Sequence, residues 1–207
     1  VPTELHEVTV FGPMGEEATA CFATIDNGQT AIIEMAQASG LPMVPASNRN
    51  PLLATTYGTG ELMKAALDYG CKKMIIGIGG SATNDGGAGA LMALGASFKN
   101  ADGEELVLGG GALQELATID LSEFDTRIYD VEIIVACDVT NPLTGTSGAS
   151  HVYGPQKGAT PQMVEMLDSA LKNLATVSNE LLGEDYSVCP GAGAAGGLGF
   201  ALLAFCK

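Results

Sequence analysis

The sequence is poor in positive charge. Nine Lys and Arg residues stand against 24 Asp and Glu residues, which gives a formal net charge of −15. A chain with this balance has few cations to neutralise the phosphates of a nucleic acid or the headgroups of an anionic membrane. No apolar run approaches the ~18 residues that a membrane-spanning helix needs. We therefore expect neither a nucleic acid nor a membrane among the partners of this protein.

Paired cysteines are also missing. The five cysteines are scattered without a C-x-x-C motif, and the chain contains only two histidines. Structural zinc sites need closely spaced Cys and His ligands, and disulfide frameworks use an even number of cysteines. The pattern favours reduced thiols, which are typical of a cytoplasmic protein.

Glycine, by contrast, is abundant. The chain has 28 glycines in 207 residues, without the three-residue period of collagen. Hydrophobic residues make up 46% of the sequence, so a chain of this length can build one sizeable core. The glycines gather between hydrophobic segments, where loops are expected.

Hydrophobic patterns predict a mixed α/β domain. Three strands come first, and Asn27-Gly28 between the second and third favours a type I′ hairpin turn, which predicts an antiparallel meander. Strands and helices alternate afterwards, so the fold class is α/β, with a mixed sheet, an antiparallel N-terminal meander and flanking helices. A doubly wound sheet is less expected. The predicted strands cover residues 6–11, 19–25, 30–35, 72–78 and 131–138, and the predicted helices cover residues 59–69, 88–94 and 161–182, with a last helix after residue 199.

The first group of candidate site residues lies in a glycine loop between the fourth strand and the next helix. Glycines allow close approach of the backbone to a ligand, and a helix N-terminus attracts anions. Asp85 is either the N-cap of the helix or a group that orients a hydroxyl or holds Mg²⁺. The candidates in this loop are Gly79, Gly80, Ser81, Thr83, Asn84, Asp85, Gly86 and Gly87.

A second group follows the strand at 131–138. Asp138 ends this strand, a common place for ligand contacts in α/β proteins, but an Asx-turn before Pro142 would explain Asp138 or Asn141 equally well. Lys157 lies between two glycines and is either a solvated lysine or a point charge for a phosphate. His151 is interpreted as a surface histidine.

A third glycine-rich stretch, at 190–199, suits tight helix packing slightly better than anion binding. Both this stretch and residues 77–82 match the G-x-G-x-x-G/A pattern of dinucleotide-binding proteins, and Asp102 follows the first match at about the right distance. The first loop, however, continues through Asn84-Asp85-Gly86-Gly87 before its helix begins. A Walker A motif is absent.

Four long motifs together resemble the glycerate kinases of the bacterial glycerate-utilisation type. They are GIGGSATNDGGAG at 77–89, ACDVTNPLTG at 136–145, GPQKGA at 154–159 and PGAGAAGGLG at 190–199. The resemblance spans essentially the whole chain in the family's order, which makes it far more specific than one glycine motif.

The resemblance implies transfer of the γ-phosphoryl group of ATP, with Mg²⁺, to D-glycerate, giving 2-phosphoglycerate. It also implies that residues 1–207 are a single inserted, restriction-enzyme-like domain of a longer two-domain kinase. The partner domain would be flavodoxin-like and formed by both missing termini, so the fragment would have little activity by itself. Asp85 and Asp138 become the catalytic candidates, Asp138 also the metal ligand, and a homo-oligomer is compatible with the family.

Two other functions stay open. A dinucleotide-dependent oxidoreductase would use the loop at 77–82 for pyrophosphate and Asp102 for the ribose. A non-enzymatic domain that binds small anions would also explain glycine loops on an acidic chain.

Overall fold

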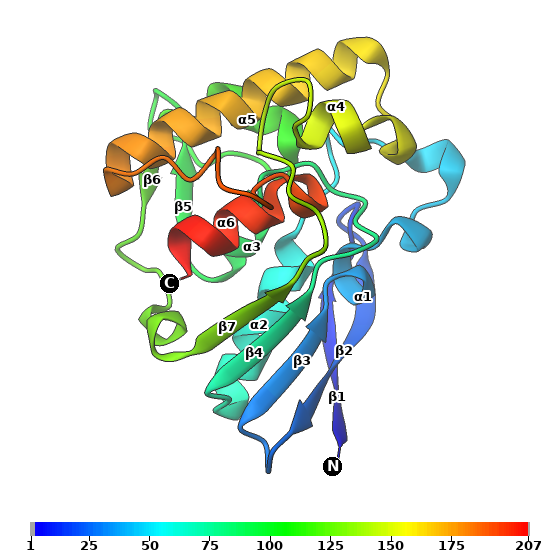
Figure 1. The fold of residues 1–207 in the computed structure, drawn as a ribbon, viewed down its shortest axis with the longest axis vertical. Helices are drawn as coiled ribbons and strands as arrows, with labels where there is room; N and C mark the ends of the chain where they lie inside the picture. Colours follow the sequence, from blue (N-terminus) through cyan, green and yellow to red (C-terminus); the bar gives the residue numbers. More distant parts are fainter. Residues whose placement is uncertain (1–2, 207) are drawn as a thin grey trace.

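The computed structural model describes residues 3–206, which form a mixed α/β fold with a five-stranded sheet, one helix behind it and further helices at one end of the sheet (Figure 1). The strands are β1 (Glu4–Phe11), β2 (Glu17–Ile25), β3 (Thr30–Glu34), β4 (Lys73–Gly77), β5 (Ser97–Lys99), β6 (Thr118–Asp120) and β7 (Glu132–Ala136). The α-helices are α1 (Ala36–Ser39), α2 (Tyr57–Tyr69), α3 (Ala88–Ala93), α4 (Ala149–Tyr153), α5 (Pro161–Leu182) and α6 (Leu198–Phe205). Short 3-10 helices cover Leu41–Met43, Ala46–Asn48, Gly110–Glu115, Thr126–Asp130, Pro155–Lys157 and Ala194–Gly197.

The main sheet has the order β1-β2-β3-β4-β7. Its first three strands are antiparallel, and β3, β4 and β7 run parallel. This arrangement confirms the predicted mixed sheet with an N-terminal meander. The restriction-enzyme-like classification stays a prediction.

The hairpin between β2 and β3 differs from the expected two-residue turn. Ile25 pairs with Thr30, so four residues form the connection. Asp26, Asn27 and Gly28 all have positive φ, at 54°, 55° and 83°. Asx residues and glycine tolerate this conformation best, which is why the local signal placed the hairpin correctly and missed its length.

The core lies between the sheet and the helices. In Figure 1, α2 crosses behind the sheet, α6 and α3 lie on the side of β7, and α4 and α5 lie beyond the carboxyl ends of β4 and β7. Ala31 and Ile33 of β3 pair with Met74 and Ile76 of β4, and all four side chains are buried. α2 ends where Gly70 takes the left-handed conformation, with φ 98°. The predicted helices at 59–69, 88–94 and 161–182 are therefore confirmed, within two residues at each end.

Two predictions at the sheet were incomplete. The strand predicted at 131–138 is shorter, because β7 ends at Ala136 and leaves Asp138 in the following loop. β7 is also an edge strand of the main sheet, and its residues alternate between exposed and partly buried. The small β5–β6 pair was not predicted, since three-residue strands leave almost no periodic signal.

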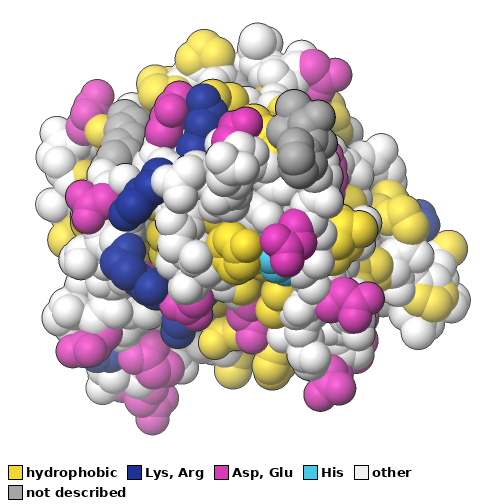
Figure 2. Space-filling model, turned by 90° about the horizontal axis from the view of Figure 1, so that it is seen from below, with side chains coloured by type: hydrophobic (Ala, Val, Ile, Leu, Met, Phe, Trp, Pro, Cys, Tyr) yellow, Lys and Arg dark blue, Asp and Glu magenta, His cyan; other side chains and the backbone are white. Residues whose placement is uncertain are grey.

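The surface reflects the excess of acidic residues. Figure 2, which views the molecule from below, shows Asp and Glu side chains distributed around this face, whereas most of the Lys and Arg side chains lie on its left side. Within residues 3–206, no helix combines the length and apolar character needed to cross a membrane.

Candidate functional site

The candidate site lies where the parallel strands end. Glu34, Gly77 and Ala136 are neighbours in register across β3, β4 and β7, so the segments after β4 and β7 leave the sheet side by side. A cleft of about 200 Å³ opens there. It is lined by Ile78, Gly79, Gly80, Ser81, Ala136, Cys137, Asp138, Val139, Tyr153, Gln156, Lys157, Ala194 and Ala195.

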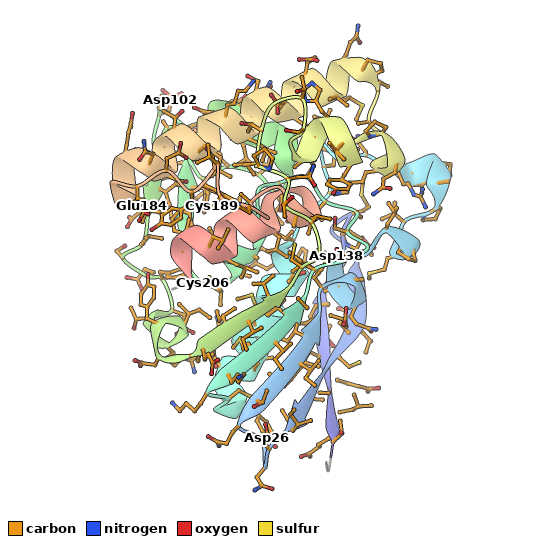
Figure 3. All side chains as sticks on the ribbon, in the orientation of Figure 1. Asp26, Asp102, Asp138, Glu184, Cys189 and Cys206 are labelled. Atoms are coloured by element: carbon orange, nitrogen blue, oxygen red, sulfur yellow. The ribbon has the colours of Figure 1, made fainter. Side chains whose placement is uncertain are left out.

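Asp138 is the carboxylate of this cleft. Its side chain is exposed just beyond the carboxyl end of β7, as Figure 3 shows. No other Asp or Glu lines the cleft among residues 3–206. Asp102 lies at a distant exposed turn beyond β5 in the same view. The predicted pairing of a dinucleotide loop with Asp102 is therefore wrong, because the two are far apart.

The first part of the glycine loop faces the cleft. Gly79 and Gly80 are exposed, and Ser81 lines the cleft although it is only 6% exposed. A Cβ at Gly79 would meet nothing within 4 Å. This end of the loop thus presents backbone and one hydroxyl to the cleft, and ligand binding there stays a prediction.

The second part of the loop is buried. Asp85 is 1% exposed and does not line the cleft. Its carboxylate accepts hydrogen bonds from the backbone N–H and hydroxyl of Thr56, at 2.8 and 2.9 Å, and from the N–H groups of Gly87 and Gly89, at 3.2 and 3.3 Å. Burial raises the pKa of Asp85, and these hydrogen bonds oppose that shift. The geometry favours the structural role for Asp85, and a catalytic role stays a prediction.

These contacts also correct the expectation of a free helix N-terminus. The Gly87 and Gly89 amides donate to Asp85, and the amide of Ala90 donates to Thr56 Oγ1 at 3.0 Å. The anion held at the start of α3 is therefore the protein's own carboxylate. Gly86 and Gly87 serve packing, because a Cβ there would lie 2.2 Å from Leu174 or 2.4 Å from Ala201.

Lys157 is the cation of the site. The side chain is 2% exposed, yet it lines the cleft, and Nζ donates to the Thr83 carbonyl oxygen at 2.6 Å. Desolvation lowers the pKa of Lys157 to about 7, and the charge of Asp85 opposes this in part. A lysine of this kind differs from the solvated surface residue that was the alternative interpretation.

The remaining predicted residues, Thr83, Asn84 and Asn141, lie outside the lining of the cleft, and the two asparagines form hydrogen bonds within the protein. Thr83 and Asn84 are fully buried, and Asn84 Nδ2 donates to Ser150 Oγ at 2.9 Å. Asn141 holds its own loop by donating to the Ser147 carbonyl oxygen at 2.7 Å, and it accepts a hydrogen bond from Tyr153 at 2.8 Å. Neither Thr83, Asn84 nor Asn141 lines the cleft.

Several cleft residues escaped prediction. Cys137 and Gln156 are direct neighbours of predicted residues, so their motifs already pointed to them. Ala194 and Ala195 come from the third glycine stretch, and Ala195 has φ 52°, which is rare for alanine. That stretch packs closely, as expected: a Cβ at Gly196 would lie 2.0 Å from the Thr83 carbonyl oxygen.

The donor set for a metal is small. The described residues contain no group of three or more His, Cys, Asp or Glu side chains that could hold an ion. Mg²⁺ often uses one or two carboxylates and fills its other positions with phosphate oxygens and water. Asp138 alone therefore fits an ion that arrives with a nucleotide, and no resident metal site is built here.

Comparison with known proteins identifies the family. A family model described as "Glycerate kinase family" matches residues 1–207. The chain belongs to the glycerate kinase family. It is 54% identical over 199 residues to "Glycerate kinase" of Bacillus subtilis and 54% identical over 196 residues to "Glycerate 2-kinase" of Escherichia coli.

A solved structure of this family has the same fold. The crystal structure of "putative glycerate kinase 2" from Salmonella typhimurium LT2 superposes with a TM-score of 0.97 at 52% identity, over 99% of this chain and 55% of that one.

The chain spans about half the length of the curated family members that it matches. The alignments cover 96% and 95% of this chain and 52% and 51% of the Bacillus and Escherichia proteins. These shares give the matched length of each relative but not the position of the match. They therefore do not bear out the expectation that residues 1–207 are a central inserted domain.

Proposed function

We propose that the cleft takes part in the ATP-dependent phosphorylation of D-glycerate to 2-phosphoglycerate. Membership of the glycerate kinase family supports the reaction class. The observation that carries the proposal is a cleft that combines the buried Lys157 with Asp138. Among the described residues, Asp138 is the one carboxylate that lines this cleft. Phosphoryl transfer needs these two charges, one to hold phosphate oxygens and one near the attacking hydroxyl.

The reaction would proceed by in-line displacement. The 2-hydroxyl oxygen of glycerate attacks the γ-phosphorus, the bond from this phosphorus to the β–γ bridging oxygen breaks, and ADP leaves with that electron pair. The hydroxyl proton passes to a base, and Asp138 is the group we assign, because it is the exposed carboxylate of the cleft.

Charge neutralisation would come from Lys157 and the open end of the glycine loop. Lys157 is flanked by the backbone of Thr83, so its amine is held in one place before a ligand arrives. Preorganised charges in a partly desolvated cleft stabilise a developing phosphate charge more than solvated ones do. Gly79 and Gly80 leave the backbone uncovered for close approach.

Mg²⁺ would enter as part of the nucleotide complex. The ion supplies neutralisation of the phosphate oxygens, and Asp138 is the side chain that would contact it or its water shell. If Asp138 instead binds the ion directly, a water molecule or the glycerate carboxylate would take the proton in its place.

The test is an ADP-release assay with D-glycerate, run on this chain and on the complete product of its gene. We expect glycerate-dependent ADP formation and 2-phosphoglycerate as the product. The variant Asp138→Asn should lower kcat by about 100-fold or more, whereas Asp102→Asn, at an exposed turn, should leave it unchanged.

Two outcomes would overturn the proposal. One is the lack of any glycerate-dependent ADP from the complete gene product. The other is tight binding of NADH without a response to ATP and glycerate, which would favour the oxidoreductase.

A further inference from the structure

Lys157 has no anionic partner in a cleft that is open to ligands. The Lys157 side chain is only 2% exposed, and its Nζ donates a hydrogen bond to the Thr83 carbonyl oxygen at 2.6 Å. Across residues 3–206, no carboxylate forms an ion pair with it. The Lys157 amine is therefore held by a backbone carbonyl, and no carboxylate in direct contact with it compensates the charge of its ammonium form.

A buried, uncompensated ammonium is costly. Such a group either loses its proton or acquires an anion. The charge of Asp85 favours the ammonium, but desolvation dominates and lowers the pKa of Lys157 to about 7. Burial without a contacting anion thus favours the neutral amine over the ammonium.

We infer that Lys157 takes up a proton from solvent when an oxyanion of the nucleotide or of glycerate enters the cleft, so that anion binding and protonation of this amine are coupled. This inference rests on the proposed function and specifies how its site holds a negative charge. The ammonium has three N–H donors, so it can keep the Thr83 carbonyl and still donate to a phosphate or carboxylate oxygen.

Coupling of this kind is reciprocal. An anion that favours the ammonium raises the affinity for the proton, and the proton raises the affinity for the anion by the same factor. Above pH 7.5, each further pH unit should weaken binding by about tenfold until the pKa of the liganded amine is reached. The terminal phosphate of a nucleotide is already almost fully ionised in this range, since the second pKa of a phosphate ester is ~6.

The titration of Lys157 must be distinguished from that of other ionisable groups near its amine. Asp85 acts from the buried end of the glycine loop, and Asp138 and Cys137 line the cleft after β7. Tyr153 lines it from α4, and the Arg49 guanidinium donates to the Gln156 carbonyl oxygen at 3.3 Å. Use of a Cys137→Ser background removes the cleft thiol from the measurement, and Arg49 keeps its charge throughout.

The experiment is an NMR titration of the lysine side chains. Two of the nine Lys and Arg residues are Arg49 and Arg127, which leaves seven lysines, few enough to resolve with ¹³Cε labelling. Comparison with Lys157→Met assigns the signal of interest. It is followed from pH 6 to 10 without ligand and with saturating MgADP, D-glycerate or inorganic phosphate, and with sodium chloride as the control for ionic strength.

The expected result is a midpoint near 7 without ligand and a midpoint at least one pH unit higher with MgADP or with glycerate. Whichever probe shifts it identifies the anion that Lys157 receives. In parallel, the Kd of that probe should rise from pH 7.5 to 8.5 in the parent protein, by about two- to threefold for a midpoint shift of one pH unit and by up to about eightfold for a larger shift. It should be independent of pH in Lys157→Arg, whose guanidinium stays charged. Lys64→Met, on the exposed side of α2, should behave as the parent.

A Lys157 signal that titrates at the ordinary ~10.4 overturns the inference, as does a signal that no probe shifts. Both results are independent of turnover. An enzyme that forms ADP with glycerate but shows no shift would retain the proposed function and refute the coupling. If Lys157→Met does not fold, Lys157→Arg and the ligand arms on the parent protein still decide the question.

Discussion

The two ends of one glycine loop have opposite roles. Gly79 and Gly80 are exposed at the cleft, whereas every residue from Ser81 to Ala90 is buried. A Cβ would find open space at Gly79, but at Gly87 it would lie 2.4 Å from Ala201 Cβ. Glycine serves backbone exposure at the first position and close packing at the second. A glycine-rich motif therefore does not by itself locate a ligand.

The same contrast holds for the two acidic candidates. Asp138 is exposed in the cleft, and Asp85 is 1% exposed behind it. Asp85 holds the first turns of α2 and α3 together through the amides of Thr56, Gly87 and Gly89. The buried end of the loop thus acts as a rigid support, on which the exposed end and Lys157 are positioned.

The largest difference between the two ends should appear on adding one methyl group. Gly87→Ala places a Cβ against Ala201 and the Leu198 backbone, at a residue with φ 77°. Overpacking and the left-handed conformation should together lower the free energy of unfolding by about 2–5 kcal/mol. Gly79→Ala should change it by less than about 0.5 kcal/mol. Urea denaturation of both variants measures this, and equal losses would show that the two ends do not differ.

A smaller effect is expected for Asp85→Asn. The amide keeps the shape of the carboxylate but presents N–H groups to backbone donors, which leaves some of them without an acceptor. We expect a loss of about 2–4 kcal/mol in the free energy of unfolding. Asp102→Asn, at an exposed turn, is the matched control. An Asp85→Asn protein with unchanged stability and no kinase activity would restore the catalytic role and refute the structural one.

Local sequence signals located most of the fold. The helix at 161–182 has Pro161 in its first turn, a Thr160 side chain that caps Met163, and Gly183 with φ 75° at its end, so each boundary has a local cause. The edge position of β7 has no such cause, because strand order depends on contacts between distant segments. Three-residue β5 and β6 are likewise stabilised by each other and not by their own pattern.

The site was predictable to a similar degree. Gly79, Gly80, Ser81, Asp138 and Lys157 came from their motifs and do line the cleft. The sequence could not separate them from Thr83, Asn84 and Asp85, because burial is decided by α5, α6 and the 3-10 helix at Ala194–Gly197, which fold over the loop. Tyr153 was missed for the same reason. Its hydroxyl reaches Asn141 from a separate helix.

The smallest of the expected effects concerns the pH dependence of stability. In the folded chain the pKa of Lys157 is about 7, below the ordinary ~10.4 of an unfolded chain. Between these values the unfolded chain binds a proton that the folded chain lacks, so stability rises with pH in that range. Over one unit, from pH 7.5 to 8.5, this contribution should approach about 1.4 kcal/mol without ligand.

The comparison of parent and Lys157→Met isolates this contribution. Burial also raises the pKa of the Cys206 thiol to about 12, which lowers stability as the pH passes the ordinary thiol value of ~8.5, but this contribution is common to the parent and Lys157→Met. The slope of unfolding free energy against pH should be larger in the parent than in Lys157→Met, and saturating ligand should remove the difference. Equal slopes without ligand would mean that the buried amine keeps its proton at neutral pH, and the cleft would then hold a permanent positive charge.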